Sequence, residues 1–382
     1  MDKNNGAIYD ARKLGKPKMI ILGIQHMFAM FGATILVPIL TGLDISTTLL
    51  MAGLGTLLFH CITKFKVPAF LGSSFAFLGG YAAIKAFSPN DPNSMLPYAC
   101  LGVACAGLIY FILAAVIKAV GIEKVMRFFP PVVTGPIIIA IGLGLAPSAV
   151  SNCTTNWFLA VVALAVIVVF NIWGKGMAKI IPIILGLLIS YGTGLVLYFI
   201  SQANPDLIQN VPWLFSGGAD ANGVYQPIFD FTSLNTICDN ISKGHIFGSE
   251  GLIGIPIHWD KTVFGGIDYS NGALIASSII AIVPIAFATM MEHIGDICAI
   301  SSTTGNNYIK DPGLHRTLVG DGLATTLASL FGGPANTTYG ENTGVLALTR
   351  VYDPRVIRIA AYFAVAVSFF PIVSVIIGSI PS

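Results

Sequence analysis

Hydrophobic residues fill long, nearly unbroken segments of this chain, and polar residues are confined to short connections and one long stretch. A helix needs about 20 mainly apolar residues to cross the hydrocarbon core of a membrane. By this measure the sequence predicts eleven spans, near residues 19–42, 47–63, 68–86, 97–120, 130–150, 155–173, 180–203, 271–302, 317–333, 335–350 and 355–378. Several of these spans are short or interrupted. The pattern predicts an all-α polytopic membrane protein.

The composition strengthens this prediction. Hydrophobic residues make up 55% of the chain and charged residues only 10%, with a mean hydropathy of +0.80, whereas about a quarter of the residues in a soluble domain are charged. The first apolar run follows the mostly polar residues 1–18 and is too long for the core of a signal peptide, so it is interpreted as the first span. We therefore expect a multi-pass protein of the cell (inner) membrane.

The cationic residues predict the orientation, because Lys and Arg that flank spans are retained on the cytoplasmic side. With a cytoplasmic N-terminal segment 1–18, the eleven spans place all but three of the 20 Lys and Arg residues inside, the exceptions being Lys85, Lys243 and Lys261. The same orientation places the long polar stretch 204–270 outside, as an extracellular loop between two blocks of spans. The N-terminus is thus predicted to be cytoplasmic.

Two of the predicted spans are interrupted in the same way. Residues 67–75 and 332–340 each place Pro, Gly and hydroxyl residues where a helix would begin. Backbone that is not helical at membrane depth persists only where protein or a cavity satisfies its polar groups, and matching interruptions in two halves of a chain mark the substrate site of a transporter. Each interrupted span is the third of its block, which indicates an inverted repeat. The alternatives are two unrelated short spans or the re-entrant loops of a channel.

Three acidic residues stand out within apolar sequence: Glu292, Asp296 and Glu341. Ionisable groups are costly there and are functional by default. Glu292 and Asp296 are four residues apart and share a helix face, while His293 is expected to point elsewhere. Two carboxylates one turn apart repel each other, which suits proton coupling; the alternative is a helix end where Asp296 is solvated. Glu341 follows an interrupted stretch, so its carboxylate and the free amides of a helix start could together grip a planar ligand.

A family resemblance adds to this interpretation. Residues 341–350 resemble the signature of the nucleobase-ascorbate transporter (nucleobase:cation symporter) family: an acidic or amide residue, Asn-x-Gly, four residues, then Thr and a cation. The Gln25–His26 pair and residues 70–77 and 311–316 are similar to the bacterial uracil branch of that family, which also includes uracil-xanthine permeases. Together these matches extend over residues 19–378.

The resemblance implies about fourteen spans in two inverted repeats of seven, divided into a core and a gate domain, with a short strand at the start of spans 3 and 10. Spans 12–14 of that pattern are expected to be absent from this chain. The implied division is a cytoplasmic segment, core spans 1–4, gate spans 5–7, the extracellular loop and core spans 8–11, at residues 1–18, 19–128, 129–203, 204–270 and 271–378.

The resemblance also assigns roles to residues near the two interruptions. Glu292 and Glu341 would bond the edge of a nucleobase, the amides of Phe75 and Gly340 would donate to its carbonyls, and the side chains of Phe75 and Tyr339 would cover its ring. Coupling to the proton would fall to Glu292 and Asp296. Structural polar residues near the site would be Gln25, His26, Ser74 and Asn342.

The function predicted from these residues is the import of a nucleobase, above all uracil, by proton symport. Glu341 suits uracil, whereas Asp296 stands where purine carriers often have Asp, so a xanthine or uric acid symporter is one alternative and a channel or anion exchanger another. No metal-ligand cluster, nucleophile-base pair or phosphate-binding loop indicates an enzyme or a cofactor. The expected partners are the nucleobase, a proton and membrane lipid, with a homodimer left open and no nucleic acid.

Overall fold

The computed structural model describes residues 7–121, 123–124, 127, 131–175, 178, 182–220, 222–248 and 251–378. The chain divides into two compact units. The first unit comprises residues 1–141 and 255–369, and the second comprises residues 142–254 and 370–382. The predicted boundary between residues 128 and 129 lies outside the described residues.

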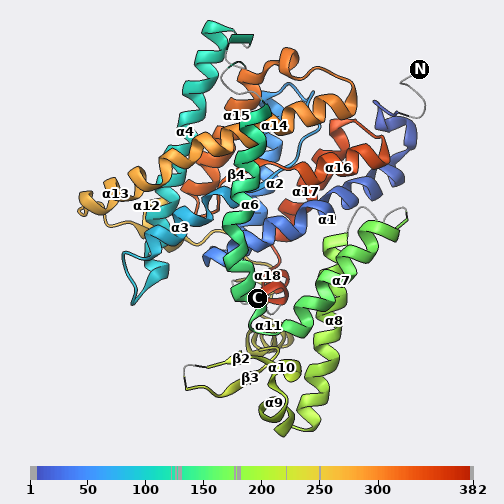
Figure 1. Cartoon of the computed structure of the whole chain (residues 1–382), viewed down its shortest axis with the longest axis vertical. Helices are drawn as coiled ribbons and strands as arrows, with labels where there is room; N and C mark the ends of the chain where they lie inside the picture. Colours follow the sequence, from blue (N-terminus) through green and yellow to red (C-terminus); the bar gives the residue numbers. More distant parts are fainter. Residues whose placement is uncertain are drawn as a thin grey trace. The chain divides into compact units, whose positions relative to one another are not determined.

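Five helices form the frame of the first unit (Figure 1). They are α1 (Lys16–Thr41), α2 (Ile45–Ile62), α4 (Leu96–Val120), α15 (Leu314–Leu330) and α17 (Pro354–Ser368). Helix α15 packs on both α2 and α4, and α17 packs on α1 and α2. The approach of α4 to α15 depends on small residues, because a Cβ on Gly107 would lie 2.7 Å from the carbonyl oxygen of Gly322.

Both interrupted spans consist of a strand followed by a short helix, as the family resemblance implies. In the first, β1 (Leu71–Ser73) leads into the 3-10 turn η2 (Phe75–Phe77) and α3 (Leu78–Lys85). In the second, β4 (Asn336–Thr338) leads into α16 (Gly340–Thr349). The two strands pair antiparallel, with Leu71 opposite Thr338 and Ser73 opposite Asn336. Two segments far apart in the sequence thus meet inside the first unit.

The remaining long apolar segment of the first unit is continuous from α13 (Gly272–Ile282) through η6 (Val283–Ile285) to α14 (Ala286–Thr304). Helix α14 ends at Gly305, which adopts the left-handed conformation (φ 75°) that favours glycine. A turn, η7 (Ile309–Gly313), then leads into α15. Helix α14 contacts β4, α15 and α16, so it borders the strand pair.

The N-terminal segment folds against the link between α16 and α17. The amide of Ile8 donates to the carbonyl of Arg350 at 2.8 Å, and the amide of Tyr352 donates back to the Ile8 carbonyl at 2.8 Å. The Asp353 carboxylate caps α17 and accepts from the amide of Ala11 at 2.8 Å. The far end of α16 is therefore tied to the start of the chain.

The second unit contains the paired helices α7 (Trp157–Trp173) and α8 (Pro182–Ala203) and a small hairpin of β2 (Ser216–Ala219) and β3 (Tyr225–Pro227). Its other helices are α9 (Asp206–Asn210), α10 (Pro212–Phe215), α11 (Thr232–Ser242) and α18 (Pro371–Gly378), and α6 (Pro131–Cys153) joins the two units in sequence. The predicted loop 204–270 thus contains short helices and a hairpin.

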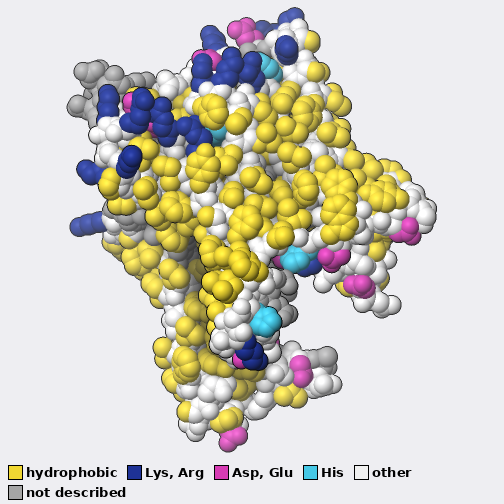
Figure 2. All heavy atoms as spheres, turned by 180° about the vertical axis from the view of Figure 1, so that it is seen from behind, with side chains coloured by type: hydrophobic (Ala, Val, Ile, Leu, Met, Phe, Trp, Pro, Cys, Tyr) yellow, Lys and Arg dark blue, Asp and Glu magenta, His cyan; other side chains and the backbone are white. Residues whose placement is uncertain are grey.

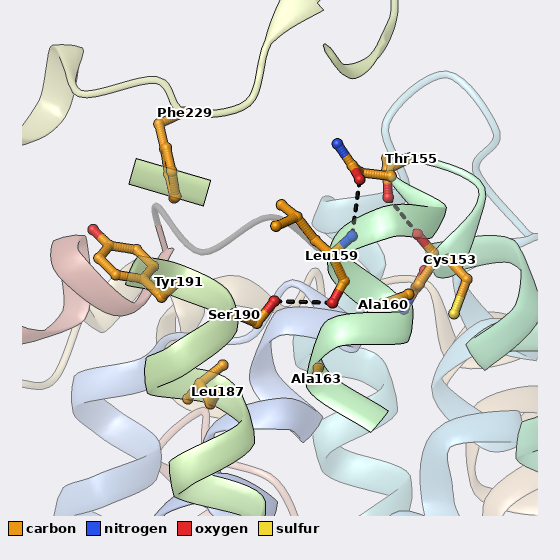
Figure 3. A pocket seen from close by; sticks show the side chains of 11 residues that line it. Cys153, Thr155, Leu159, Ala160, Ala163, Leu187, Ser190, Tyr191 and Phe229 are labelled. Atoms are coloured by element: carbon orange, nitrogen blue, oxygen red, sulfur yellow. Dashed lines mark hydrogen bonds between the residues drawn. The ribbon is translucent and has the colours of Figure 1, made fainter. Parts of the chain in front are cut away.

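A cavity of about 170 Å³ lies between α7, α8 and the segment after β3 (Figure 3). Leu159 and Tyr191 line it, and Phe229 reaches over it from the segment after β3. The Asn156 side chain accepts from the Leu159 amide and donates to the Ser216 carbonyl at 2.9 Å, which holds the start of α7. The polar atoms of Asn156 are engaged in holding this fold, and none of the residues assigned to the substrate lies here.

The described residues contain five helices long and apolar enough to cross a membrane, or six if α17 and α18 are taken as one broken span. This count covers only long helices; the shorter apolar helices Phe75–Lys85 and Trp157–Trp173 lie within the predicted spans 68–86 and 155–173. The predicted span 355–378 is broken between Ser368 and Pro371, where proline lacks the N–H that would continue the helix. Figure 2 shows hydrophobic side chains over most of one face, with Lys and Arg gathered towards one end of the first unit.

Candidate functional site

The paired strands place two helix starts side by side in the first unit. The ladder extends by one bond at each end, from the Ser74 amide to the Ala335 carbonyl at 2.9 Å and from the Tyr339 amide to the Phe70 carbonyl at 3.0 Å. The next amides along the chain belong to Phe75 and Gly340, each the first residue of a helix. Such amides lack an intrahelical acceptor and are available to a ligand.

Threonine and asparagine side chains fix the strand pair to the helices behind it. The Thr56 hydroxyl on α2 accepts from the Leu71 amide at 2.9 Å and donates to the Leu71 carbonyl at 3.2 Å. The Thr325 hydroxyl on α15 donates to the backbone carbonyl of Asn336. The side-chain amide of Asn336 donates to the backbone carbonyl of Met51 at 2.8 Å. All of these groups are buried, so the backbone at membrane depth has its partners within the protein.

Tyr339 lies across β1 and joins the two interrupted spans. Its hydroxyl donates to the Ser73 carbonyl at 2.9 Å and accepts from the Thr34 hydroxyl at 3.3 Å. Its ring occupies the space above Gly72, where a Cβ would lie 2.5 Å from Tyr339 Cε2. Tyr339 is only 4% exposed, whereas Phe75 is half-buried. Of the two predicted ring contacts, Phe75 is therefore the more accessible.

Three carboxyl groups lie on α14 and in the first turn of α16. Glu292 is half-buried, and its Oε2 atom has no hydrogen-bond partner among the described residues. Asp296 Oδ2 accepts from the Thr338 hydroxyl at 2.8 Å, and a Cβ on Gly340 would lie 3.7 Å from Asp296 Oδ1. Glu341 is exposed in the first turn of α16. Asp296 therefore lies close to the start of α16, and Glu292 precedes it by one turn of α14.

A fourth carboxylate, which the sequence analysis missed, lies behind these three. Asp321 on α15 is fully buried, with Oδ1 3.4 Å from His293 Nδ1 and Oδ2 3.4 Å from the Thr337 hydroxyl. It lies between two glycines within the predicted span 317–333. The criterion that singles out Glu292, an ionisable residue within apolar sequence, would also have identified Asp321.

His293 belongs to the same network, contrary to the expectation that it points away from the acids. Its Nδ1 is 3.3 Å from the Thr338 hydroxyl, which also donates to Asp296. The imidazole is fully buried between α14, β4 and α15. Spacing along one helix did not predict this contact because Thr338 and Asp321 approach His293 from other elements. The polar chain thus runs from Asp296 through Thr338 to His293 and Asp321.

The four predicted structural polar residues lie around the same strands. Asn342 donates to His26 Nδ1 at 3.2 Å and to the His26 carbonyl at 3.1 Å, which joins α16 to α1. The Ser74 hydroxyl accepts from the Ala76 amide at 3.4 Å and caps η2. Gln25 is buried in α1. Within the described part of the chain no group of three or more His, Cys, Asp or Glu residues is arranged to hold a metal ion.

The chain is similar to several bacterial transport proteins over most of its length. It is 38% identical to a uracil permease of Bacillus caldolyticus, over 95% of this chain and 74% of that protein. It is 36% identical to a probable uracil permease of Haemophilus influenzae, over 97% of this chain and 78% of that protein. These similarities indicate a transporter and not an enzyme.

A solved structure resembles the fold. The transmembrane domain of a cyanobacterial bicarbonate transporter, BicA, superimposes with a TM-score of 0.57 at 14% identity, over 97% of this chain and 88% of that domain. At this level of identity the likeness concerns the fold alone. The model of the permease family (Xan_ur_permease) matches residues 17–382. The chain therefore belongs to this permease family, and its long apolar helices agree with a multi-pass membrane transporter.

Proposed function

We propose that the protein imports uracil together with a proton across the cell (inner) membrane, with its N-terminus in the cytoplasm. The observation that carries the proposal is the exposed position of Glu341 in the first turn of α16, next to Gly340, where a Cβ would lie 3.7 Å from Asp296 Oδ1. One turn before Asp296 on α14, Glu292 has a buried Oε2 atom with no partner among the described residues. The names of the relatives, uracil permease and probable uracil permease, support this choice of substrate.

The groups around the strand pair complement the edge of a uracil ring, which carries two N–H donors and two carbonyl acceptors. A carboxyl group accepts hydrogen bonds through both oxygens when it is ionised and still accepts when it carries a proton, so Glu292 and Glu341 suit the ring N–H groups. The amides of Phe75 and Gly340 only donate and suit the carbonyls. The half-buried Phe75 ring lies directly beside one of these amides and provides an aromatic face for the base.

Glu292 and Asp296 are the proposed proton carriers. They share one face of α14, and the Thr338 hydroxyl supports Asp296 from behind. Two negative charges this close in a low-dielectric setting repel each other, and a proton on one of them removes the repulsion and permits the substrate to bind. In this scheme the first unit is the core domain, because all the proposed site residues belong to it.

Uptake of tritiated uracil into proteoliposomes tests the proposal. Glu341→Gln removes one acceptor and places a donor opposite a ring N–H, so uptake should fall at least about tenfold. Glu123→Gln, an exposed glutamate far from the site in sequence, is the matched control and should keep wild-type uptake. Unchanged uptake by Glu341→Gln would exclude the site.

Two further experiments test the coupling to protons and the identity of the substrate separately. A protonophore should abolish accumulation, and persistence of accumulation would exclude proton coupling while leaving the site intact. Unlabelled uracil should compete at lower concentration than unlabelled xanthine. The reverse order would assign the protein to purines.

A further inference from the structure

A cavity of about 360 Å³ lies in the first unit, at the end of α16 opposite to the proposed uracil site. Its lining residues come from the N-terminal segment, from the segment after α2, from the turn between α14 and α15, and from the link between α16 and α17. Tyr352 of this lining lies beyond the last residue of α16, and the ten residues of that helix rise by roughly 15 Å. The cavity is therefore separate from the proposed substrate site and shares no residue with it.

Tyr9 gives this cavity an aromatic wall that is held in place from two sides. Its hydroxyl donates to the carbonyl of Thr304 at 2.7 Å, and its ring meets the ring of Tyr352 edge to face, with 5.5 Å between the centroids. The neighbouring Ile8 is bonded on both its amide and its carbonyl. Tyr9 is nevertheless 47% exposed. A ring that is fixed and still half exposed can stack on a planar ligand with little further loss of side-chain freedom.

Two neighbouring asparagines provide an acceptor and a donor for a ligand. Asn306 donates through Nδ2 to the Tyr308 hydroxyl at 3.3 Å, and its Oδ1 atom has no partner among the described residues. Asn307 is arranged in the opposite way, since its Oδ1 accepts from the Lys310 amide at 3.1 Å and its Nδ2 has no partner in the described part of the chain. Both side chains line the cavity. One free acceptor and one free donor group complement the N–H and C=O on the edge of a cyclic amide.

The charged groups of the lining compensate each other. Lys66 forms an ion pair with Asp311, and no other Lys, Arg, Asp or Glu among the described residues lines the cavity. A lining whose charges are paired offers no excess of either sign to an ion, so it favours a neutral ligand over a phosphate or a carboxylate. The ligand that fits the wall, the free amide groups and this charge balance is a neutral planar ring.

We propose that this cavity binds a nucleobase or a related neutral cyclic amide, as a second site apart from the site of transport. The ring stacks on Tyr9, a ring N–H donates to Asn306 Oδ1, and the adjacent ring carbonyl accepts from Asn307 Nδ2. The side chains of Lys66 and Asp311 are 44% and 67% exposed, so water competes for these groups and the dissociation constant should lie in the millimolar range. The ligand class follows from the lining alone, whereas the choice of uracil as the probe rests on the proposed function.

Equilibrium binding of uracil to the purified full chain tests the proposal, because a tight and a weak class of site titrate in different concentration ranges. Asn307→Asp keeps an oxygen for the Lys310 amide and replaces the free donor by a second acceptor, so the weak class should lose at least about tenfold in affinity. Asn222→Asp, an exposed asparagine between β2 and β3, is the matched control and should keep both classes. The compound 1,3-dimethyluracil lacks both ring N–H groups and should not occupy the weak class.

The variant Glu341→Gln distinguishes this proposal from the proposed function. It should weaken the tight class and leave the weak class unchanged, and an unchanged tight class would contradict the proposed function alone. The second site would be overturned by absence of the weak class from the wild type, or by wild-type weak binding in Asn307→Asp. Tighter binding of uridine monophosphate than of uracil to the weak class would show that the cavity selects an anion and would overturn the proposal of a neutral ligand.

Discussion

The two interrupted spans have the same backbone arrangement but carry different side chains. Each has a three-residue strand, one further ladder bond and a helix that begins at once. The first helix begins with Phe75, Ala76 and Phe77, and no acid occurs in its first turn, whereas the second begins with Gly340 and Glu341. Behind the first strand lies the hydroxyl of Thr56, and behind the second lies the chain of His293 and Asp321. The strand pair thus positions two equivalent amides, and only the second span adds a carboxylate in its first turn.

The largest expected effect comes from the polar chain behind the second strand. Asp321→Asn replaces a fully buried carboxyl group that faces His293 and Thr337, and leaving buried polar groups of this kind without their partner costs up to about 3 kcal/mol. The free energy of unfolding should fall by about that amount in a denaturant titration of the purified protein. Thr56→Val, behind the first strand, is the matched comparison and should cost about 1 kcal/mol. Equal losses in the two variants would remove the asymmetry between the spans.

Glu292→Gln should weaken uracil binding next most strongly. A hydrogen bond to a charged group contributes about 1.5–3 kcal/mol, which corresponds to roughly a 10- to 150-fold loss of affinity. Isothermal titration of purified protein with uracil measures this change. Phe75→Leu, on the first span, keeps an apolar side chain and should lose less than about tenfold. A larger loss for Phe75→Leu than for Glu292→Gln would contradict the proposal that the acids accept the hydrogen bonds of the ring N–H groups.

Gly72→Ala should displace Tyr339 from its place across the first strand. The new Cβ would lie 2.5 Å from the ring, and overpacking of this kind costs about 1–3 kcal/mol. Gly79, also in the first span, is the control position, because a Cβ added there would meet no atom within 4 Å. Thermal unfolding should show a lower Tm for Gly72→Ala and an unchanged Tm for Gly79→Ala. A wild-type Tm for Gly72→Ala would show that the ring moves without cost.

The smallest effect is expected where the N-terminal segment ties the end of the second span. Two hydrogen bonds from the Arg12 guanidinium lower the pKa of Asp10 from 3.8 to about 2. A lowered pKa stabilises the folded protein above about pH 4, and this contribution is lost as the pH falls towards about 2. Asp10→Asn should lower the Tm slightly at neutral pH and leave it nearly unchanged near about pH 2. An equal change at both pH values would show that the charge of Asp10 is irrelevant.

The sequence predicted the interrupted spans and their acids because Pro, Gly and isolated charges leave local signals. The break in helix at residues 71–73 and the position of Glu341 just after a helix start follow from such signals, and the structure confirms them. The contact of His293 with Asp321 did not follow, since it forms between α14 and α15 and depends on tertiary packing. The break between Ser368 and Pro371 within the predicted span 355–378 did not follow either, because the hydropathy of a segment does not register a helix break.

The most direct test of the central claim is the equilibrium binding of tritiated uracil to purified Glu341→Gln protein. The dissociation constant is expected to rise at least about tenfold relative to the wild type, with Glu123→Gln unchanged and with the same Tm for all three proteins. Wild-type affinity in a folded Glu341→Gln protein would contradict the claim that the exposed start of α16 recognises the substrate.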